Sequence, residues 1–203
     1  AGPITTAPVV APSMLAADQA ALGAEAARME AAGADWLHID IVDGHMVPNL
    51  TIGPPVVAAM RRHTRCVLDC HCAVTNPEDF VDPLAAAGAD QMSFHVEATK
   101  DPAALALRIR AAGMRVGAVL RPQIPASEVV PLCEAGLVDY VNCMSVQPGF
   151  GGAAFDERAL PKLEELRARF PDLPLQVDGG VSVEKGTAQR AAAAGATVIV
   201  AGS

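Results

Sequence analysis

The chain has 203 residues, 51% of them apolar, and a formal net charge of −8. The length suits one domain, and the sequence has neither a low-complexity tract nor an apolar run long enough to span a bilayer, which argues against a disordered or membrane-embedded protein. Because positive charge drives binding to phosphate backbones and the chain has no Lys/Arg cluster, we expect no nucleic acid and no membrane among its partners.

We expect a single domain over residues 1–203, with residues 1–8 as an extended lead-in. The five cysteines are odd in number and form no compact disulfide pattern, which favours a reducing compartment. The expected location is therefore the cytoplasm. The chloroplast stroma, after removal of a transit peptide, is the alternative.

An Ala-rich helical stretch repeatedly ends at a glycine and is followed by a short apolar strand. This happens at Gly33, Gly88, Gly113, Gly136 and Gly195. Glycine is the usual residue just beyond a helix end, where the backbone becomes left-handed. The spacing corresponds to one or two repeats of roughly 25 to 30 residues, the size of one strand–helix unit.

In chain order, short β-branched or apolar runs predict eight strands and Ala-rich segments predict seven helices. The strands are expected at 9–14, 35–41, 65–72, 90–95, 115–120, 138–144, 174–178 and 197–201, and the helices at 18–32, 54–62, 77–87, 101–112, 126–135, 156–169 and 182–194. This alternation predicts an α/β protein with a closed (β/α)₈ TIM barrel. An open doubly wound sheet is the alternative, but no GxGxxG follows the first strand. The eighth helix is absent from the given chain, so we expect the native chain to be longer.

Four of the predicted strands carry polar residues in otherwise apolar runs. Alternate residues of a strand share a face, so His38 and Asp40 point the same way in the second strand. In the third strand, VLDCHCAV, Asp69 and His71 share one face and the cysteines at 70 and 72 share the other. The seventh strand ends in Asp178, and Ser13 lies in the first. In such a barrel, the C-terminal ends of the strands carry the active site.

Two histidines and two aspartates at one barrel mouth predict a site for one divalent metal, with His38, Asp40, His71 and Asp178 as ligands. Mixed imidazole and carboxylate donors favour Zn²⁺ or Fe²⁺. Mn²⁺ and Co²⁺ are the alternatives. A zinc–thiolate site at CHC is disfavoured because the cysteines should face the helices. Asp69 would lie deeper and orient a ligand.

Each of these residues also has an ordinary structural explanation. A single buried histidine is more often a core residue than a ligand, and Asp-Gly at 178–179 is common turn chemistry. The joint pattern favours the metal site, because four separate explanations would otherwise be needed.

Glycine-rich segments follow the last three strands: QPGFGG at 147–152, DGG at 178–180 and AGS at 201–203. Backbone N–H groups in such loops bind phosphate in many barrels of this type. We therefore expect a small phosphorylated substrate beside the metal. Metal and carboxylates suit proton abstraction next to a carbonyl, through an enediolate, with one aspartate as base and the other as acid. Hydrolysis by a metal-activated water is an alternative on the same residues.

The segments GADWLHIDIVDGHMVPN, LDCHCAV, FHVEAT, MSVQPGFGG, VDGG and VAGS resemble the ribulose-phosphate 3-epimerase family from about residue 9 onward. The resemblance implies a metal-dependent isomerase that interconverts D-ribulose 5-phosphate and D-xylulose 5-phosphate in the pentose phosphate pathway and the Calvin cycle. It also implies a homo-oligomer.

The resemblance further assigns roles to individual residues. It implies that Asp40 and Asp178 are the acid/base pair as well as metal ligands. The residues implied to bind the substrate are Ser13, His71, Met144, Gly149, Gly151, Gly179, Gly180, Gly202 and Ser203. His95 and Glu97 match the family pattern, and we expect a structural role for them.

The chain departs from the family at several positions: Val42 and Ala73 stand where methionine is common, Met46 where phenylalanine is frequent, and Ala153 and Gln147 where other, polar residues are usual. This bears on rate and substrate strictness more than on the type of reaction. Three alternatives stay open: an epimerase of a six-carbon ketose 6-phosphate such as allulose 6-phosphate, a related aldol lyase or decarboxylase, and a non-catalytic phosphosugar-binding barrel. The lyase is disfavoured because such enzymes place a lysine at the strand ends, and none is found there.

Overall fold

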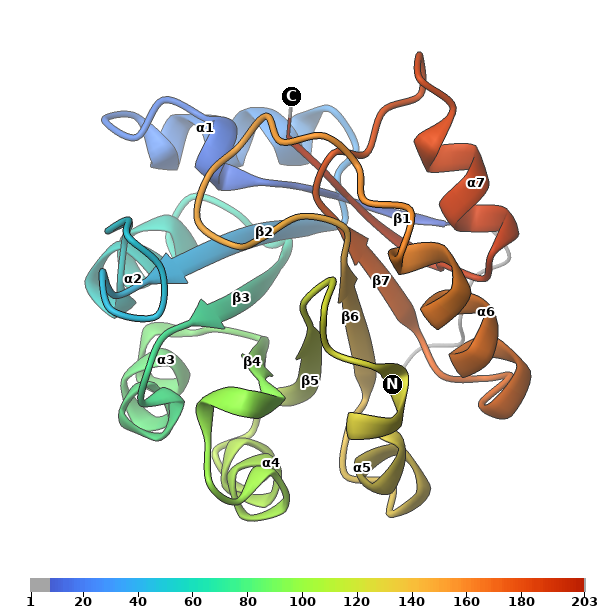
Figure 1. Ribbon diagram of the computed structural model, residues 1–203. Helices are drawn as coiled ribbons and strands as arrows, with labels where there is room; N and C mark the ends of the chain where they lie inside the picture. The colour runs from blue at the N-terminus through green and yellow to red at the C-terminus, as the bar shows by residue number, and fades with distance from the viewer. Residues whose placement is uncertain (1–7, 203) are drawn as a thin grey trace.

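Eight parallel strands surrounded by helices make up the computed structural model, which describes residues 8–202 (Figure 1). The strands are β1 (Val9–Pro12), β2 (Trp36–Val42), β3 (Val67–Ala73), β4 (Gln91–His95), β5 (Arg115–Leu120), β6 (Tyr140–Met144), β7 (Leu175–Asp178) and β8 (Val198–Ala201). They pair in the order β1-β8-β7-β6-β5-β4-β3-β2. A parallel bridge between Ser13 and His38 joins the two ends of this sheet and closes it. The predicted barrel is therefore confirmed.

Seven α-helices lie outside the barrel within residues 8–202. They are α1 (Leu22–Ala31), α2 (Pro54–Arg61), α3 (Val81–Ala87), α4 (Pro102–Ala111), α5 (Val130–Glu134), α6 (Ala159–Arg169) and α7 (Thr187–Ala193). The glycines expected beyond the helix ends, Gly33, Gly88, Gly113, Gly136 and Gly195, all have positive φ angles. No helix among the described residues is long and apolar enough to cross a membrane.

The helices are shorter than the sequence pattern predicts, and α7 shows why. The prediction began this helix at residue 182, but it begins at Thr187. Gly186 precedes it with φ +69°, a left-handed conformation that interrupts a helix. The Thr187 hydroxyl accepts a hydrogen bond from the Ser182 backbone N–H at 2.7 Å, so residues 182–186 form a turn instead.

The outward-facing strand residues and the helices form the main apolar core. It includes Ile39, Cys70, Cys72 and Phe94, all fully buried. Inside the barrel, Trp36 packs with Ala11, Val198 and Val200 in a small second cluster. Trp36 is the first residue of β2, so this cluster lies towards the amino ends of the strands.

The barrel interior is polar next to this cluster. Fully buried polar side chains lie on the inward face of the strands: His38, Asp69, His71, Gln91, Ser93, His95, Asn142 and Gln176. An inward-facing polar layer in a protein core is costly unless its members have partners. It is this layer that supports the site at the carboxyl ends of the strands.

Candidate metal and active site

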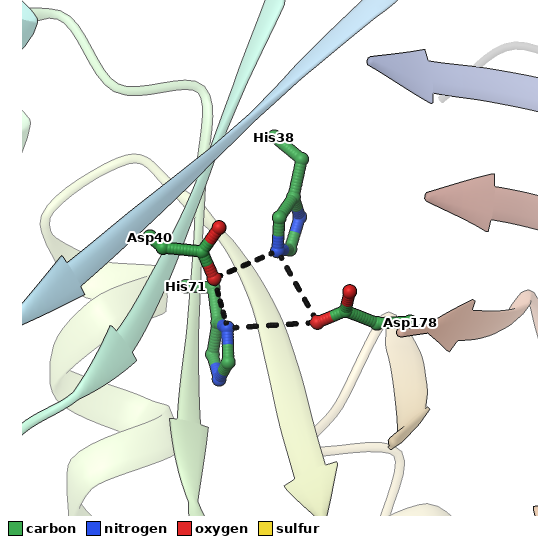
Figure 2. A group of neighbouring side chains, drawn as sticks. All are labelled: His38, Asp40, His71 and Asp178. Carbon is green, nitrogen blue, oxygen red and sulfur yellow. Dashed lines mark hydrogen bonds and ion pairs between the residues drawn. The ribbon is translucent and has the colours of Figure 1, made fainter. Parts of the chain in front are cut away.

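Four side chains predicted as metal ligands converge at the carboxyl ends of the strands (Figure 2). His38 and Asp40 come from β2, His71 from β3 and Asp178 from β7. Each offers one nitrogen or oxygen atom, and these four atoms lie within 4.8 Å of one another. Residues distant in sequence meet here because β2 and β3 are paired neighbours and closure of the barrel brings β7 close to them.

The distances show one shared centre. His38 Nε2 lies 3.5 Å from Asp40 Oδ1 and 3.5 Å from Asp178 Oδ2. His71 Nδ1 lies 3.0 Å from Asp40 Oδ1 and 3.8 Å from Asp178 Oδ2. Each imidazole thus directs one nitrogen towards both carboxylates, and Figure 2 shows these four contacts as a ring of dashed lines.

The charges of these four side chains favour a positive charge between them. Burial by itself would lower the pKa of His38, but Asp40, Asp69 and Asp178 outweigh it and raise that pKa well above its ordinary value. Burial would raise the pKa of Asp40, but the two histidines outweigh it and lower that pKa. In the protein alone a proton on an imidazole supplies the positive charge, and a cation could replace it.

His38 Nε2 gives a direct test of whether a metal fits. This atom is buried and has no hydrogen-bond partner among the residues that the structure describes. An unpartnered buried nitrogen is costly, and a cation between it and the two carboxylates would satisfy it. Imidazole nitrogens with carboxylate oxygens are also a normal donor set for a divalent transition metal. The residues therefore fit a metal ion.

The other nitrogen of His38 is held by a buried carboxylate. His38 Nδ1 lies 2.7 Å from Asp69 Oδ2. Asp69 also accepts hydrogen bonds from the Tyr140 hydroxyl at 2.7 Å and from Gln176 Nε2 at 2.8 Å. Because a carboxylate accepts, a neutral His38 carries its proton on Nδ1, and the lone pair of Nε2 is then available to a cation at the centre. Asp69 thus lies where the sequence analysis expected a ligand-orienting residue.

The other nitrogen of His71 meets a second imidazole. His71 Nε2 lies 3.0 Å from Nε2 of His95, which is fully buried on β4. Burial lowers the pKa of His95 to about 4, so this ring is neutral at neutral pH. Glu97 lies on the far side of His95 and contacts Arg121. Burial would raise the pKa of Glu97, but its contacts with His95 and Arg121 help to lower it to about 2.

The cysteines of β3 take no part in the centre. Cys70 and Cys72 are fully buried in the apolar core between the strands and the helices, as the alternation of faces predicted. Burial raises the pKa of both thiols, which keeps them protonated. A thiolate metal site at CHC is excluded by this orientation.

Ser13 follows β1 and contacts one of the aspartates. Its hydroxyl donates a hydrogen bond to Asp40 Oδ2 at 3.2 Å, while Asp40 Oδ1 faces His71. The hydroxyl also accepts from the Leu15 backbone N–H at 3.3 Å. Ser13 therefore holds one oxygen of Asp40 and leaves the other for the centre.

A pocket of about 420 Å³ opens above the four residues. Asp40 and Asp178 line it, whereas His38 and His71 are fully buried beneath. The expected substrate-binding residues that line the pocket are Ser13, Met144, Gly149, Gly151, Gly179, Gly180 and Gly202. Ser203 lies outside the described residues. The carboxylates can thus reach a molecule in the pocket. His71, also expected to bind the substrate, does not line the pocket.

The glycine-rich loops surround one side of this pocket. Among the described residues, the backbone N–H groups of Gly149, Gly151, Gly179 and Gly180 donate no hydrogen bond. At Gly180, φ is +59° and a Cβ atom would lie 2.4 Å from the Phe155 backbone nitrogen, so only glycine fits. The long connection between β6 and α6 arches over this end of the barrel (Figure 1). These N–H groups are available to an anionic ligand.

Sequence reasoning missed the residues behind the histidines. It did not identify Tyr140, Gln176 or Arg121, and it did not place His95 against His71. The available signal was the run of inward-facing polar residues on β4, β6 and β7, a pattern that an ordinary barrel core would not need.

Comparisons with known proteins agree with this site. Residues 9–203 match the model of the ribulose-phosphate 3 epimerase family. The chain is 53% identical to the cytoplasmic isoform of ribulose-phosphate 3-epimerase from Oryza sativa subsp. japonica, over 96% of this chain and 85% of that protein. It is 47% identical to ribulose-phosphate 3-epimerase from Schizosaccharomyces pombe, with the same coverage.

Similar solved structures include a mutant tryptophan synthase alpha-subunit from Pyrococcus furiosus. The TM-score is 0.69 at 19% identity, covering 95% of this chain and 86% of that one. At this identity the likeness shows the shared barrel fold alone. The family match and the high identity over nearly the whole chain establish more: the chain belongs to the ribulose-phosphate 3-epimerase family and is an isomerase.

Proposed function

We propose that the protein epimerises C3 of a ketopentose phosphate and so interconverts D-ribulose 5-phosphate and D-xylulose 5-phosphate. The observation that carries this proposal is the convergence of two imidazoles and two carboxylates within 4.8 Å at the base of a pocket lined by glycine loops. Family membership supplies the substrate class, and the side chains supply the acid/base groups.

His38, Asp40, His71 and Asp178 would hold one divalent metal ion. The donor set supports Zn²⁺ or Fe²⁺, with Mn²⁺ and Co²⁺ as alternatives, because imidazole and carboxylate together suit borderline ions. When bound, such an ion stabilises negative charge on substrate oxygens next to the reacting carbon. The unpartnered His38 Nε2 supports this assignment.

Asp40 and Asp178 would act as the acid/base pair. Both carboxylates line the pocket, and they come from strands on different sides of the centre. One aspartate removes the C3 proton, and the electron pair of the broken C–H bond moves into the enediolate. The other aspartate, protonated beforehand, delivers its proton to C3 from the opposite face. The two aspartates have then exchanged protonation states, which prepares the enzyme for the reverse reaction.

Ser13 supports this role of Asp40. Its hydroxyl donates to Asp40 Oδ2, and the lowered pKa of Asp40 keeps it ionised at neutral pH. A carboxylate held in this way is positioned for proton abstraction rather than free to rotate.

The glycine loops would bind the phosphate group of the substrate. The free N–H groups of Gly149, Gly151, Gly179 and Gly180 support this, together with Gly202 at the same pocket. A chain of net charge −8 needs such local donors to hold an anion. Met144, which is buried and lines the same pocket, would cover the reacting carbons.

Three further expectations stay predictions. The similarity to a cytoplasmic isoform supports a cytoplasmic location. The family resemblance implies a homo-oligomer, and the sequence predicts a single domain over residues 1–203.

The test is exchange of the C3 proton of D-ribulose 5-phosphate in D₂O, followed by NMR. The Zn²⁺-loaded protein should incorporate deuterium at C3 and form xylulose 5-phosphate. Asp178→Asn should lose about 10²- to 10⁴-fold in rate, the usual contribution of one acid/base group. Asp172→Asn, an exposed aspartate near the start of β7, is the matched control and should keep the full rate.

Absence of exchange by the metal-loaded protein would overturn the proposal. Faster turnover of allulose 6-phosphate than of ribulose 5-phosphate would keep the mechanism but change the substrate. Binding of ribulose 5-phosphate without turnover would favour a non-catalytic barrel.

A further inference from the structure

The contact between His71 and His95 constrains where the two rings carry their protons, whether or not a substrate is bound. Two imidazole nitrogens 3.0 Å apart form a hydrogen bond only if one carries a proton and the other a lone pair. The contact therefore couples the tautomers of the two rings. His95 is fully buried, so water does not compete for this bond.

The direction of the bond decides whether His71 can be a ligand. His71 Nδ1 faces Asp40 and Asp178, and a nitrogen that binds a metal must offer its lone pair there. The proton of His71 then lies on Nε2 and is donated to His95 Nε2. His95 must in turn carry its own proton on Nδ1.

Glu97 and Arg121 favour this arrangement. His95 Nδ1 lies 3.7 Å from Glu97 Oε1, which is too long for a hydrogen bond but places a negative charge beside that nitrogen. A proton on Nδ1 is attracted by this carboxylate, whereas a lone pair would be repelled. Arg121 Nε donates to Glu97 and holds it in place. Lys162 in turn donates to the Arg121 backbone carbonyl at 2.6 Å.

The opposite tautomer of His71, with its proton on Nδ1, is favoured by Asp40 and has to be disfavoured by other groups. Without a metal, Asp40 Oδ1 at 3.0 Å attracts a proton to His71 Nδ1. His95 would then have to donate from Nε2 and direct a lone pair at Glu97. The carboxylate of Glu97 thus opposes the tautomer in which His71 cannot bind a metal.

We propose that His95, oriented by Glu97 and Arg121, is a positioning residue that fixes His71 in the tautomer with Nδ1 free to bind the metal. This inference rests on the proposed metal site. It assigns to His95 and Glu97 a role beyond the structural one that the sequence suggested.

The experiment measures metal affinity and tautomer, with no use of catalytic activity. Zn²⁺ affinity is determined on metal-free protein by competition with a chromophoric chelator. The tautomer of His71 is read from two-bond ¹H–¹⁵N correlations of the imidazole. The variants are His95→Phe, His95→Gln and Glu97→Gln. Met92→Leu is the matched control, since Met92 is fully buried on the same strand but belongs to the apolar core outside the polar layer.

His95→Phe should weaken Zn²⁺ binding about 10- to 100-fold, the usual effect of removing a residue that orients a ligand. His95→Gln should recover most of this loss, because an amide oxygen can accept from His71 Nε2. Glu97→Gln should have a smaller effect in the same direction. Met92→Leu should bind Zn²⁺ as the wild type does. In the Zn²⁺-bound wild type, His71 should carry its proton on Nε2.

Equal Zn²⁺ affinity and an unchanged His71 tautomer in His95→Phe would overturn the inference and leave the proposed function standing. Equal losses in His95→Phe and His95→Gln would also overturn it, since they would indicate packing alone. If His95→Phe does not fold, a wild-type His71 with its proton on Nδ1 in the Zn²⁺-bound state would be enough to overturn it. A wild type that binds no Zn²⁺ would overturn both proposals.

Discussion

His38 and His71 face the same two carboxylates, but the side chains behind them differ. His38 is backed by Asp69, a buried carboxylate 2.7 Å away that is itself held by Tyr140 and Gln176. His71 is backed by His95, a neutral ring whose own support, Glu97 and Arg121, reaches the partly exposed surface. One imidazole is anchored by a charge in the barrel interior, and the other by a chain of contacts that leads outward.

The difference shows two physical routes to the same result. A carboxylate can only accept, so Asp69 determines the tautomer of His38 directly. A neutral imidazole can donate or accept, so His95 determines the tautomer of His71 only because Glu97 biases it. We therefore expect the His38 side to be the stronger support and the His71 side to be more easily altered.

Removal of the metal should have the largest effect on stability, because both histidines would lose the ion that they bind together. Zn²⁺ at about 100 times its dissociation constant should stabilise the fold by about 2.7 kcal/mol. For a chain of this size that corresponds to roughly 5–10 °C in the unfolding temperature. Thermal unfolding with and without a chelator measures it. An unfolding temperature indifferent to Zn²⁺ would contradict a metal bound by both histidines.

Asp69→Asn breaks the support of His38. It should lower Zn²⁺ affinity about 10- to 100-fold, because the charge that fixes the His38 tautomer is lost. Tyr140→Phe is the matched control. It removes one hydrogen bond to Asp69, worth about 1.5–3 kcal/mol of unfolding free energy, but leaves the charge. Chelator competition and denaturant unfolding separate the two effects. If Tyr140→Phe weakened Zn²⁺ binding as much as Asp69→Asn, the charge of Asp69 would not be what matters.

Ser13→Ala tests the support of Asp40, the carboxylate that lies nearer to His71 than to His38. The Ser13 hydroxyl donates to Asp40 Oδ2, and a hydrogen bond to a charged group is worth about 1.5–3 kcal/mol. We expect a fall in kcat/KM of roughly tenfold or more, since Asp40 becomes free to rotate away from its position. Steady-state kinetics measure this, and Ser182→Ala, on the loop after β7, is the control. An unchanged kcat/KM would show that the histidines alone hold Asp40.

Cys72→Ala should have the smallest effect on the site, although Cys72 is next to His71 in sequence. Its side chain points into the apolar core and burial keeps its pKa raised, so it supplies no thiolate. The free energy of unfolding should fall by about 1 kcal/mol, while Zn²⁺ affinity stays the same. Zn²⁺ release on this substitution would contradict the assignment of imidazole and carboxylate ligands.

Much of this arrangement was predictable from local sequence. Gly33 and Gly88 mark helix ends because their φ angles are positive, and such glycines recur at the spacing of strand–helix units. Alternation along β3 determines that Asp69 and His71 point inward and that the neighbouring cysteines point outward. Both follow from the backbone geometry of single elements. The start of α7 was less predictable, because the conformation of Gly186 decides it.

The contacts behind the two histidines were decided only by the tertiary structure. Asp69 meets Tyr140 and Gln176 across 71 and 107 residues, and the approach of His95 to His71 depends on the register of β3 and β4. Alternation tells which face a side chain occupies, but not which rotamer it takes or which atoms come within hydrogen-bond distance. The sequence by itself therefore determined the barrel and the candidate donor residues, while closure of the barrel decided which nitrogen of each histidine faces the two carboxylates.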